Sequence, residues 1–180
     1  MNRPLIDDHS FRQTQTALSV FEMLHGGPMI GYYTSVLGNP RAIPFEAPVY
    51  HWSVLPFAKV IPLEIAGRTV SVLYLVGALY FGFRLLRETL SNYRIAAPLF
   101  VLLTLSSPLY LFWGRAFLIE TCAVFWGMMY VYFGHRYLKS GTLWAFLLAC
   151  VAGSIAAIAK TTTWPAFVFV LIGFIARSEE

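Results

Sequence analysis

Residues 95–133, IAAPLFVLLTLSSPLYLFWGRAFLIETCAVFWGMMYVYF, contain two apolar runs, 95–113 and 116–133, that are separated only by Gly114-Arg115. Each run approaches the roughly 20 residues that a helix needs to cross the hydrocarbon core of a bilayer. The stretch therefore predicts two membrane-spanning helices that are joined by a tight turn into a helical hairpin.

Three more apolar runs lie near residues 65–83, 142–159 and 163–176. The last is short for a membrane span. The run at 142–159 is rich in small residues, which suit close helix packing in lipid: Ala149, Ala152, Gly153, Ser154, Ala156 and Ala157. We therefore expect an all-α polytopic membrane protein, with about five transmembrane helices in residues 65–180.

The composition supports the membrane class. Hydrophobic residues make up 58% of the 180 and charged residues only 12%, outside the range of soluble domains. The net charge of +4 does not indicate a nucleic-acid partner, because the basic residues lie in short loops between apolar runs. Cys122 and Cys150 fall inside apolar runs and are interpreted as small core residues, not as a disulfide or a metal pair.

Residues 1–64 are more polar and are expected to form an outer loop with two helices lying on the membrane surface. The first helix is predicted to start near Ser10, which has capping-box spacing with Gln13, and to end at Gly26-Gly27-Pro28. Its apolar face is expected to contain Ala17, Val20, Phe21 and Leu24. The second spans residues 48–59, and its apolar side is expected to contain Val49, Trp52 and either Leu55 or Pro56.

The loop charges predict the orientation of the chain in the membrane. The loops expected on the cytoplasmic side carry the excess of basic residues: Arg84, Arg87, Arg94, Arg136, Lys139 and Arg177. The alternate turns carry one basic residue each, Arg115 and Lys160. Residues 1–64, these two turns and the nearby Arg68 and Glu120 should then lie together on the outer face.

The adjacent carboxylates Asp7 and Asp8 are candidates for general-base chemistry on an acceptor hydroxyl or amine. Helix N-capping is the more common role for such a pair, since Asp is favoured at that position. Glu120 lies inside an apolar run, where an ionisable group normally faces the bundle interior or an aqueous cavity. A structural pair with Arg68 or Arg115 is the alternative.

Lys160 precedes three threonines and suits a phosphate as a point charge, although a lone lysine at this position more often extends to the membrane interface. Glu46 lies in a proline-bounded loop, and His51 follows it. With Asp7, Asp8 and Glu120 they offer oxygen and nitrogen ligands suited to a divalent metal ion, in a spacing too loose to be a metal signature. A loop histidine is more often a hydrogen-bonding residue.

Taken in order, these segments resemble the GT-C superfamily of glycosyltransferases that use polyprenyl-phosphate sugars, and most closely its family 39 branch of protein mannosyltransferases and aminoarabinose transferases. The resemblance is carried by Asp7-Asp8, by Phe45-Glu46-Ala47-Pro48 with Tyr50 and Trp52, by Gly67-Arg68, by the segment from Arg115 to Glu120 and by Lys160. Asp8 stands where the family has Glu, Glu120 where it has Asp, and Ala47 where it has Lys. Family members begin with a helix before the first of these segments and continue through many more, so we expect this chain to be an N-terminal fragment.

The resemblance implies transfer of a sugar to a lipid, glycan or protein acceptor, on the periplasmic face of a bacterial inner membrane or the luminal face of the endoplasmic reticulum. It implies Asp7 and Asp8 as catalytic residues and Arg68, Arg115 and Lys160 as groups that stabilise the phosphate. Glu46, His51 and Glu120 would hold a divalent metal or position the acceptor. Part of a transporter and an inactive remnant are the alternatives, and charges at helix ends instead of mid-span favour the transferase over the transporter.

Overall fold

The computed structural model describes residues 10–33 and 46–178. All regular structure in these residues is α-helical, which confirms the predicted all-α class. The helices are α1 (Ser10–Leu24), α2 (Val49–Ala58), α3 (Leu63–Thr89), α4 (Tyr93–Ser106), α5 (Pro108–Trp113), α6 (Glu120–Ser140), α7 (Leu143–Ala159) and α8 (Trp164–Ser178).

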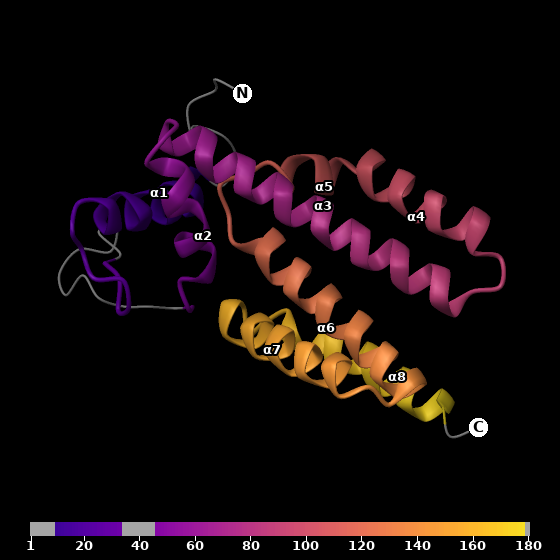
Figure 1. Ribbon diagram of the computed structural model, residues 1–180. Coiled ribbons are helices and arrows are strands. Elements are labelled where there is room, and N and C mark those ends of the chain that lie inside the picture. Colours follow the sequence, from indigo (N-terminus) through magenta and orange to yellow (C-terminus); the bar gives the residue numbers. More distant parts are fainter. Residues whose placement is uncertain (1–9, 34–45, 179–180) are drawn as a thin grey trace.

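The long helix α3 lies between α4 and α6, and α6 in turn packs against α7 and α8 (Figure 1). The two short helices α1 and α2 pack together at the end of the bundle where α3 and α6 begin. The basic residues in the last turns of α3, α6 and α8 lie at the opposite end, because these helices run away from α1 and α2. The fold therefore separates this group of basic residues from the end that carries α1 and α2.

Helix α3, with 27 residues, is the one helix in the described ranges that is long and apolar enough to cross a membrane. Helices α4, α7 and α8 are apolar but shorter. The run at 95–113 is not one helix, because Ser107 is extended (φ −70°, ψ 123°) and divides it into α4 and α5. A proline follows at 108, and a residue before proline is disfavoured in the α conformation.

The predicted tight hairpin at Gly114-Arg115 is wrong. Residues 114–119 form a connection without regular structure, and α6 begins only at Glu120. Polar contacts hold this connection against the small helices and α3. The Ser71 hydroxyl donates to the Ala116 carbonyl at 2.6 Å, and the Phe117 N–H donates to Gln13 Oε1 at 3.3 Å.

The predicted boundaries of the two outer helices are confirmed, but their buried faces differ from the prediction. Helix α1 buries Ala17 and Val20 as expected, whereas Phe21 is 46% exposed. Helix α2 buries the face that contains Tyr50, His51, Val54 and Leu55, and leaves Trp52 and Pro56 exposed. The buried face of α2 follows from its position between α1 and α3, which both cover it.

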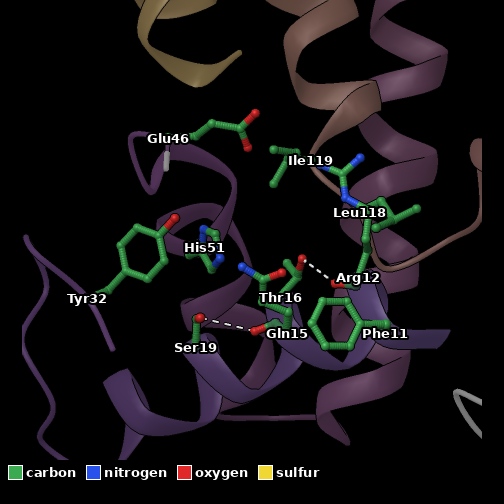
Figure 2. Close-up of a pocket in the computed structure, with 10 residues that line it drawn as sticks. All are labelled: Phe11, Arg12, Gln15, Thr16, Ser19, Tyr32, Glu46, His51, Leu118 and Ile119. Atoms are coloured by element: carbon green, nitrogen blue, oxygen red, sulfur yellow. Dashed lines mark hydrogen bonds between the residues drawn. The ribbon is translucent and has the colours of Figure 1, made fainter. Parts of the chain in front are cut away.

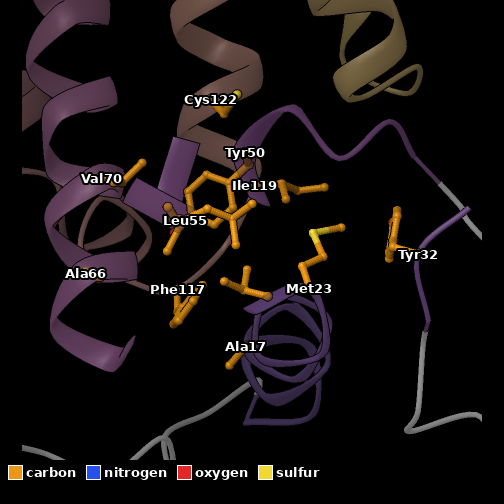
Figure 3. Packing of buried hydrophobic residues seen from close by; sticks show 12 residues of the cluster. Ala17, Met23, Tyr32, Tyr50, Leu55, Ala66, Val70, Phe117, Ile119 and Cys122 are labelled. Carbon is orange, nitrogen blue, oxygen red and sulfur yellow. The ribbon is translucent and has the colours of Figure 1, made fainter. Parts of the chain in front are cut away.

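Tyr50 lies in the middle of the cluster that joins α1, α2, α3 and the start of α6 (Figure 3). Its hydroxyl donates to the Gly67 carbonyl at 2.8 Å and also bonds the Ser71 hydroxyl at 2.9 Å. The Phe117 ring packs directly on the α3 backbone, since a Cβ at Gly67 would lie 2.5 Å from it. Cys122 is a core residue as predicted. A small residue at position 67 is therefore needed where this cluster meets α3.

The small residues of α7 face α6, as the sequence predicts. Ala149, Ala152, Gly153 and Ala156 are buried, and a Cβ at Gly153 would lie 2.9 Å from the Tyr130 ring. Ser154 and Ala157 lie outside this buried face, and Cys150 is exposed, contrary to its predicted core position. Close packing of α7 on α6 brings the end of α7 beside the start of α6.

Candidate functional site

Three charged side chains from distant parts of the chain meet at the end of the bundle that carries α1 and α2. Glu120 Oε1 accepts a hydrogen bond from Lys160 Nζ at 2.8 Å and one from Arg12 Nη1 at 3.3 Å. Glu120 is the first residue of α6 and Lys160 directly follows α7. Glu120 and Lys160 therefore have the signs that their helix termini favour, whereas Arg12 is a cation in the first turn of α1.

The two cations differ in burial. The Lys160 side chain is 11% exposed and the Glu120 side chain 20%, whereas the Arg12 side chain is 48% exposed. The second oxygen of Glu120, Oε2, is buried without a hydrogen-bond partner among the described residues. Lys160 is consequently the inner partner of Glu120, and Arg12 can move towards solvent at lower cost.

Glu46 belongs to the same charged group. Partial burial raises the pKa of its carboxyl, the cations Lys160 and Arg12 lower it, and the Glu120 carboxylate raises it again. The next residue, Ala47, donates its N–H to the Ile158 carbonyl at 3.0 Å, which fastens this segment to the end of α7. Two carboxylates and two cations are thus held within electrostatic reach of one another.

A cavity of about 520 Å³ opens beside these charges, between α1 and α2 (Figure 2). Its lining residues are Phe11, Arg12, Gln15, Thr16, Ser19, Tyr32, Glu46, His51, Leu118 and Ile119. His51 is 5% exposed, and its Nδ1 has no hydrogen-bond partner within the described ranges. Burial lowers the pKa of the His51 imidazole to about 4, so the ring is neutral at pH 7.

The structure brings together some of the residues that the sequence selects. Glu46 and His51 line the cavity, and Glu120 and Lys160 form an ion pair beside it. Arg115 is exposed and forms no salt bridge with any described residue. The alternative, in which Glu120 pairs with Arg68 or Arg115, is not what the structure shows, since Lys160 and Arg12 bind its Oε1.

Arg68 is buried on α3, and Asp7 and Asp8 lie outside the described residues. Arg12 was not selected from the sequence, although a signal for it is present. Polar side chains recur on α1 at Arg12, Gln15, Thr16 and Ser19, the spacing of one helical face. That stripe now forms one wall of the cavity.

The divalent-metal hypothesis gains no support from the part of the chain that the structure describes. No group of three or more histidine, cysteine, aspartate or glutamate side chains there is arranged to hold a metal ion. Glu120 instead satisfies its charge with two cations. A metal site here would need ligands from Asp7 or Asp8.

No protein-family model, curated protein or solved structure matches this chain. The resemblance to GT-C transferases therefore stays a prediction from the ordered local motifs of the sequence.

Proposed function

We propose that this chain carries the donor-phosphate end of a membrane glycosyltransferase active site, which moves a sugar from a polyprenyl-phosphate donor to an acceptor on the outer side of the membrane. The observation that carries the proposal is the Arg12–Glu120–Lys160 group beside a cavity that polar and apolar side chains line together. Its three side chains come from segments that are far apart in the sequence. Glu120 and Lys160 belong to segments on which the family resemblance rests, and Arg12 does not.

In the proposed reaction an acceptor oxygen or nitrogen attacks the anomeric carbon of the donor sugar. The bond from that carbon to the phosphate oxygen breaks, and its electron pair stays on the phosphate. Asp7 takes the proton of the acceptor, which completes the exchange. The configuration at the anomeric carbon inverts because attack comes from the side opposite the phosphate.

The departing phosphate gains negative charge, which preorganised cations stabilise. Lys160 and Arg12 are the cations beside the cavity, and Glu120 holds both in place before the donor arrives. Arg12 makes the longer contact and is the more exposed, so it is the cation that most easily turns from Glu120 to a phosphate. Glu120 is thereby a positioning residue, which holds the more buried Lys160 in a fixed orientation.

In this proposal α3 crosses the bilayer. Helices α6, α7 and α8 each form a further span, and α4 and α5 together form one more. Large apolar side chains on α4, α7 and α8 are exposed in the bundle, for example Leu102, Trp144 and Phe169. Exposed side chains of this kind are stable against lipid and unstable against water. The site then lies at the outer end of the bundle, and the basic loops at the cytoplasmic end.

The test is sugar transfer by the purified, membrane-reconstituted protein from a panel of polyprenyl-phosphate-linked hexoses and pentoses. Lys160→Gln should lower the transfer rate by about 100-fold, the scale seen when one charge-stabilising group is lost. The matched control is Lys139→Gln, at the far end of the bundle and exposed, which should leave the rate unchanged. Equal rates for the two variants would remove Lys160 from the mechanism.

A further inference from the structure

The cavity between α1 and α2 has walls that accept hydrogen bonds. The Ser19 hydroxyl already donates its hydrogen to backbone, with the Gln15 and Tyr33 carbonyls both at 3.0 Å. The Thr16 hydroxyl donates to the Arg12 carbonyl at 3.0 Å. Each hydroxyl has one hydrogen, so what remains for a ligand is the oxygen lone pairs. Figure 2 shows these side chains along the α1 wall.

The opposite wall adds His51 and Glu46. A neutral imidazole has one N–H and one bare nitrogen, and a carboxylate only accepts. The buried Nδ1 of His51 has no partner among the described residues, so these residues leave one hydrogen-bonding position of the ring unused. A buried polar atom without a partner is costly, and a ligand that supplies the missing hydrogen bond removes that cost.

These walls suit a ligand that both donates and accepts hydrogen bonds, because Arg12 and Gln15 offer donors and the hydroxyl lone pairs and Glu46 offer acceptors. A phosphate or carboxylate ligand would be attracted by Arg12 but would face the Glu46 carboxylate and the hydroxyl lone pairs on the other walls. A sugar offers one donor at each hydroxyl group. The rings of Phe11 and Tyr32 supply flat apolar surfaces of the kind that pack against the C–H faces of sugars, and Tyr32 lies 4.9 Å from the His51 ring between centroids.

The volume and the position of the cavity also suit a saccharide. Its volume of about 520 Å³ falls in the range of small-molecule sites. It lies at the α1 and α2 end of the bundle, beside the Arg12–Glu120 pair, whereas the exposed apolar faces of α4, α7 and α8 run along the bundle. A polyprenyl chain would be placed against those apolar faces instead.

We infer that this cavity binds a neutral saccharide and that His51 is a positioning residue for it through hydrogen bonds to sugar hydroxyl groups. A further step rests on the proposed transferase function: the bound saccharide is then the acceptor. The acceptor would be a glycan in preference to a protein or an amino group of a lipid. Its attacked hydroxyl would then lie near the cations that hold the donor phosphate.

The experiment measures saccharide binding directly by saturation-transfer NMR on the full chain, purified in a zwitterionic detergent without a sugar headgroup. The probes are methyl glycosides of glucose, galactose, mannose, arabinose and N-acetylglucosamine, with inorganic phosphate as the anionic comparison. At least one glycoside should bind, and phosphate should not compete with it. His51→Phe, which keeps a ring but removes both nitrogens, should raise the dissociation constant by about 5-fold or more.

His51→Gln restores an acceptor and a donor and should recover most of the affinity. The matched control is His25→Phe, because His25 is exposed at the end of α1 and does not line the cavity. Ser19→Ala provides a second test at the other wall and should also weaken binding. No glycoside binding up to about 100 mM, or equal binding by wild type, His51→Phe and Ser19→Ala, would overturn the inference.

The binding test and the transfer test fail separately. Glycoside binding that depends on His51, without transfer from any polyprenyl-phosphate sugar, would support the saccharide site and contradict the transferase. Transfer that continues unchanged in His51→Phe would contradict the saccharide site and leave the transferase in place. Phosphate binding that depends on His51, without glycoside binding, would assign the cavity to an anion.

Discussion

The two hydrogen bonds to Glu120 should differ in strength by an amount that a pair of double-mutant cycles resolves. Lys160 and Glu120 are 2.8 Å apart and mostly buried, so their charge-assisted hydrogen bond should contribute about 1.5–3 kcal/mol. Arg12 and Glu120 are 3.3 Å apart, with the Arg12 side chain 48% exposed, so solvent screening limits that pair to about 0.2–1 kcal/mol. The expected coupling energies thus differ by at least about 1.5-fold.

One cycle combines Glu120→Gln with Lys160→Met, and the other combines Glu120→Gln with Arg12→Met. Each protein is unfolded with denaturant in detergent micelles, and the fluorescence of its five tryptophans gives the free energy of unfolding. The Arg84–Glu88 pair at the far end, 3.5 Å apart and partly exposed, is a matched control that should give about 0.3–0.5 kcal/mol. A coupling for Arg12 equal to or above that for Lys160 would refute the assignment of Lys160 as the inner partner.

Three other predictions concern packing, pH and membrane orientation. Gly67→Ala should destabilise the protein by about 1–3 kcal/mol, because the Phe117 ring packed on α3 leaves no room for a methyl group. Gly173→Ala has open space around the new methyl group and should stabilise the protein by about 0.5–1 kcal/mol. Thermal unfolding compares the two variants. The pKa of His51 is about 4 in the folded protein and ordinarily about 6.5, so the free energy of unfolding should fall by about 3 kcal/mol as the pH falls from 6.5 to 4. His51→Gln should remove this dependence on pH. An equal dependence in the variant would contradict the burial of His51 as a neutral ring. In a background without the native cysteines, Lys59→Cys should react with an impermeant maleimide in intact cells and Ser91→Cys only after permeabilisation, whereas the reverse pattern would invert the proposed topology.

The outer helices could be predicted closely because local chemistry sets their ends. Gly26 adopts φ +89°, a conformation that ends α1 and that glycine takes readily. Pro48 immediately precedes α2, and Lys59 follows it. Signals of this kind act within a few residues, so the sequence carries them directly.

The faces of these helices could not be predicted in the same way. A hydrophobic pattern identifies an apolar face only when one neighbour covers the helix, and α2 is covered by both α1 and α3. Tyr50 and His51 are consequently buried while Trp52 is 40% exposed. The helix break at Ser107 follows from the proline at position 108, which disfavours the α conformation in the residue before it. The continuous apolar pattern of residues 95–113 instead predicts a single helix.

The site shows the same division between charge patterning and geometry. Alternating loop charges place Glu120 and Lys160 at one end of the bundle, and the structure joins them by a 2.8 Å contact. No spacing rule links Arg12 to Glu120, which lies 108 residues away, because that contact depends on how α1 packs against the start of α6. Arg115 follows the charge rule and yet is exposed, since residues 114–119 turn it outward.

The proposed reaction depends on Asp7 as the base that takes the proton of the acceptor, and a comparison of carboxylate variants tests this role. Release of polyprenyl phosphate from a polyprenyl-phosphate sugar, with an acceptor glycan present, is followed by mass spectrometry for wild type, Asp7→Asn and Asp8→Asn. We expect turnover by wild type. The turnover rate should fall by about 100-fold or more in Asp7→Asn, which is the scale of general-base catalysis, and much less in Asp8→Asn. Turnover by Asp7→Asn at the wild-type rate, or no turnover by wild type with any donor, would contradict it.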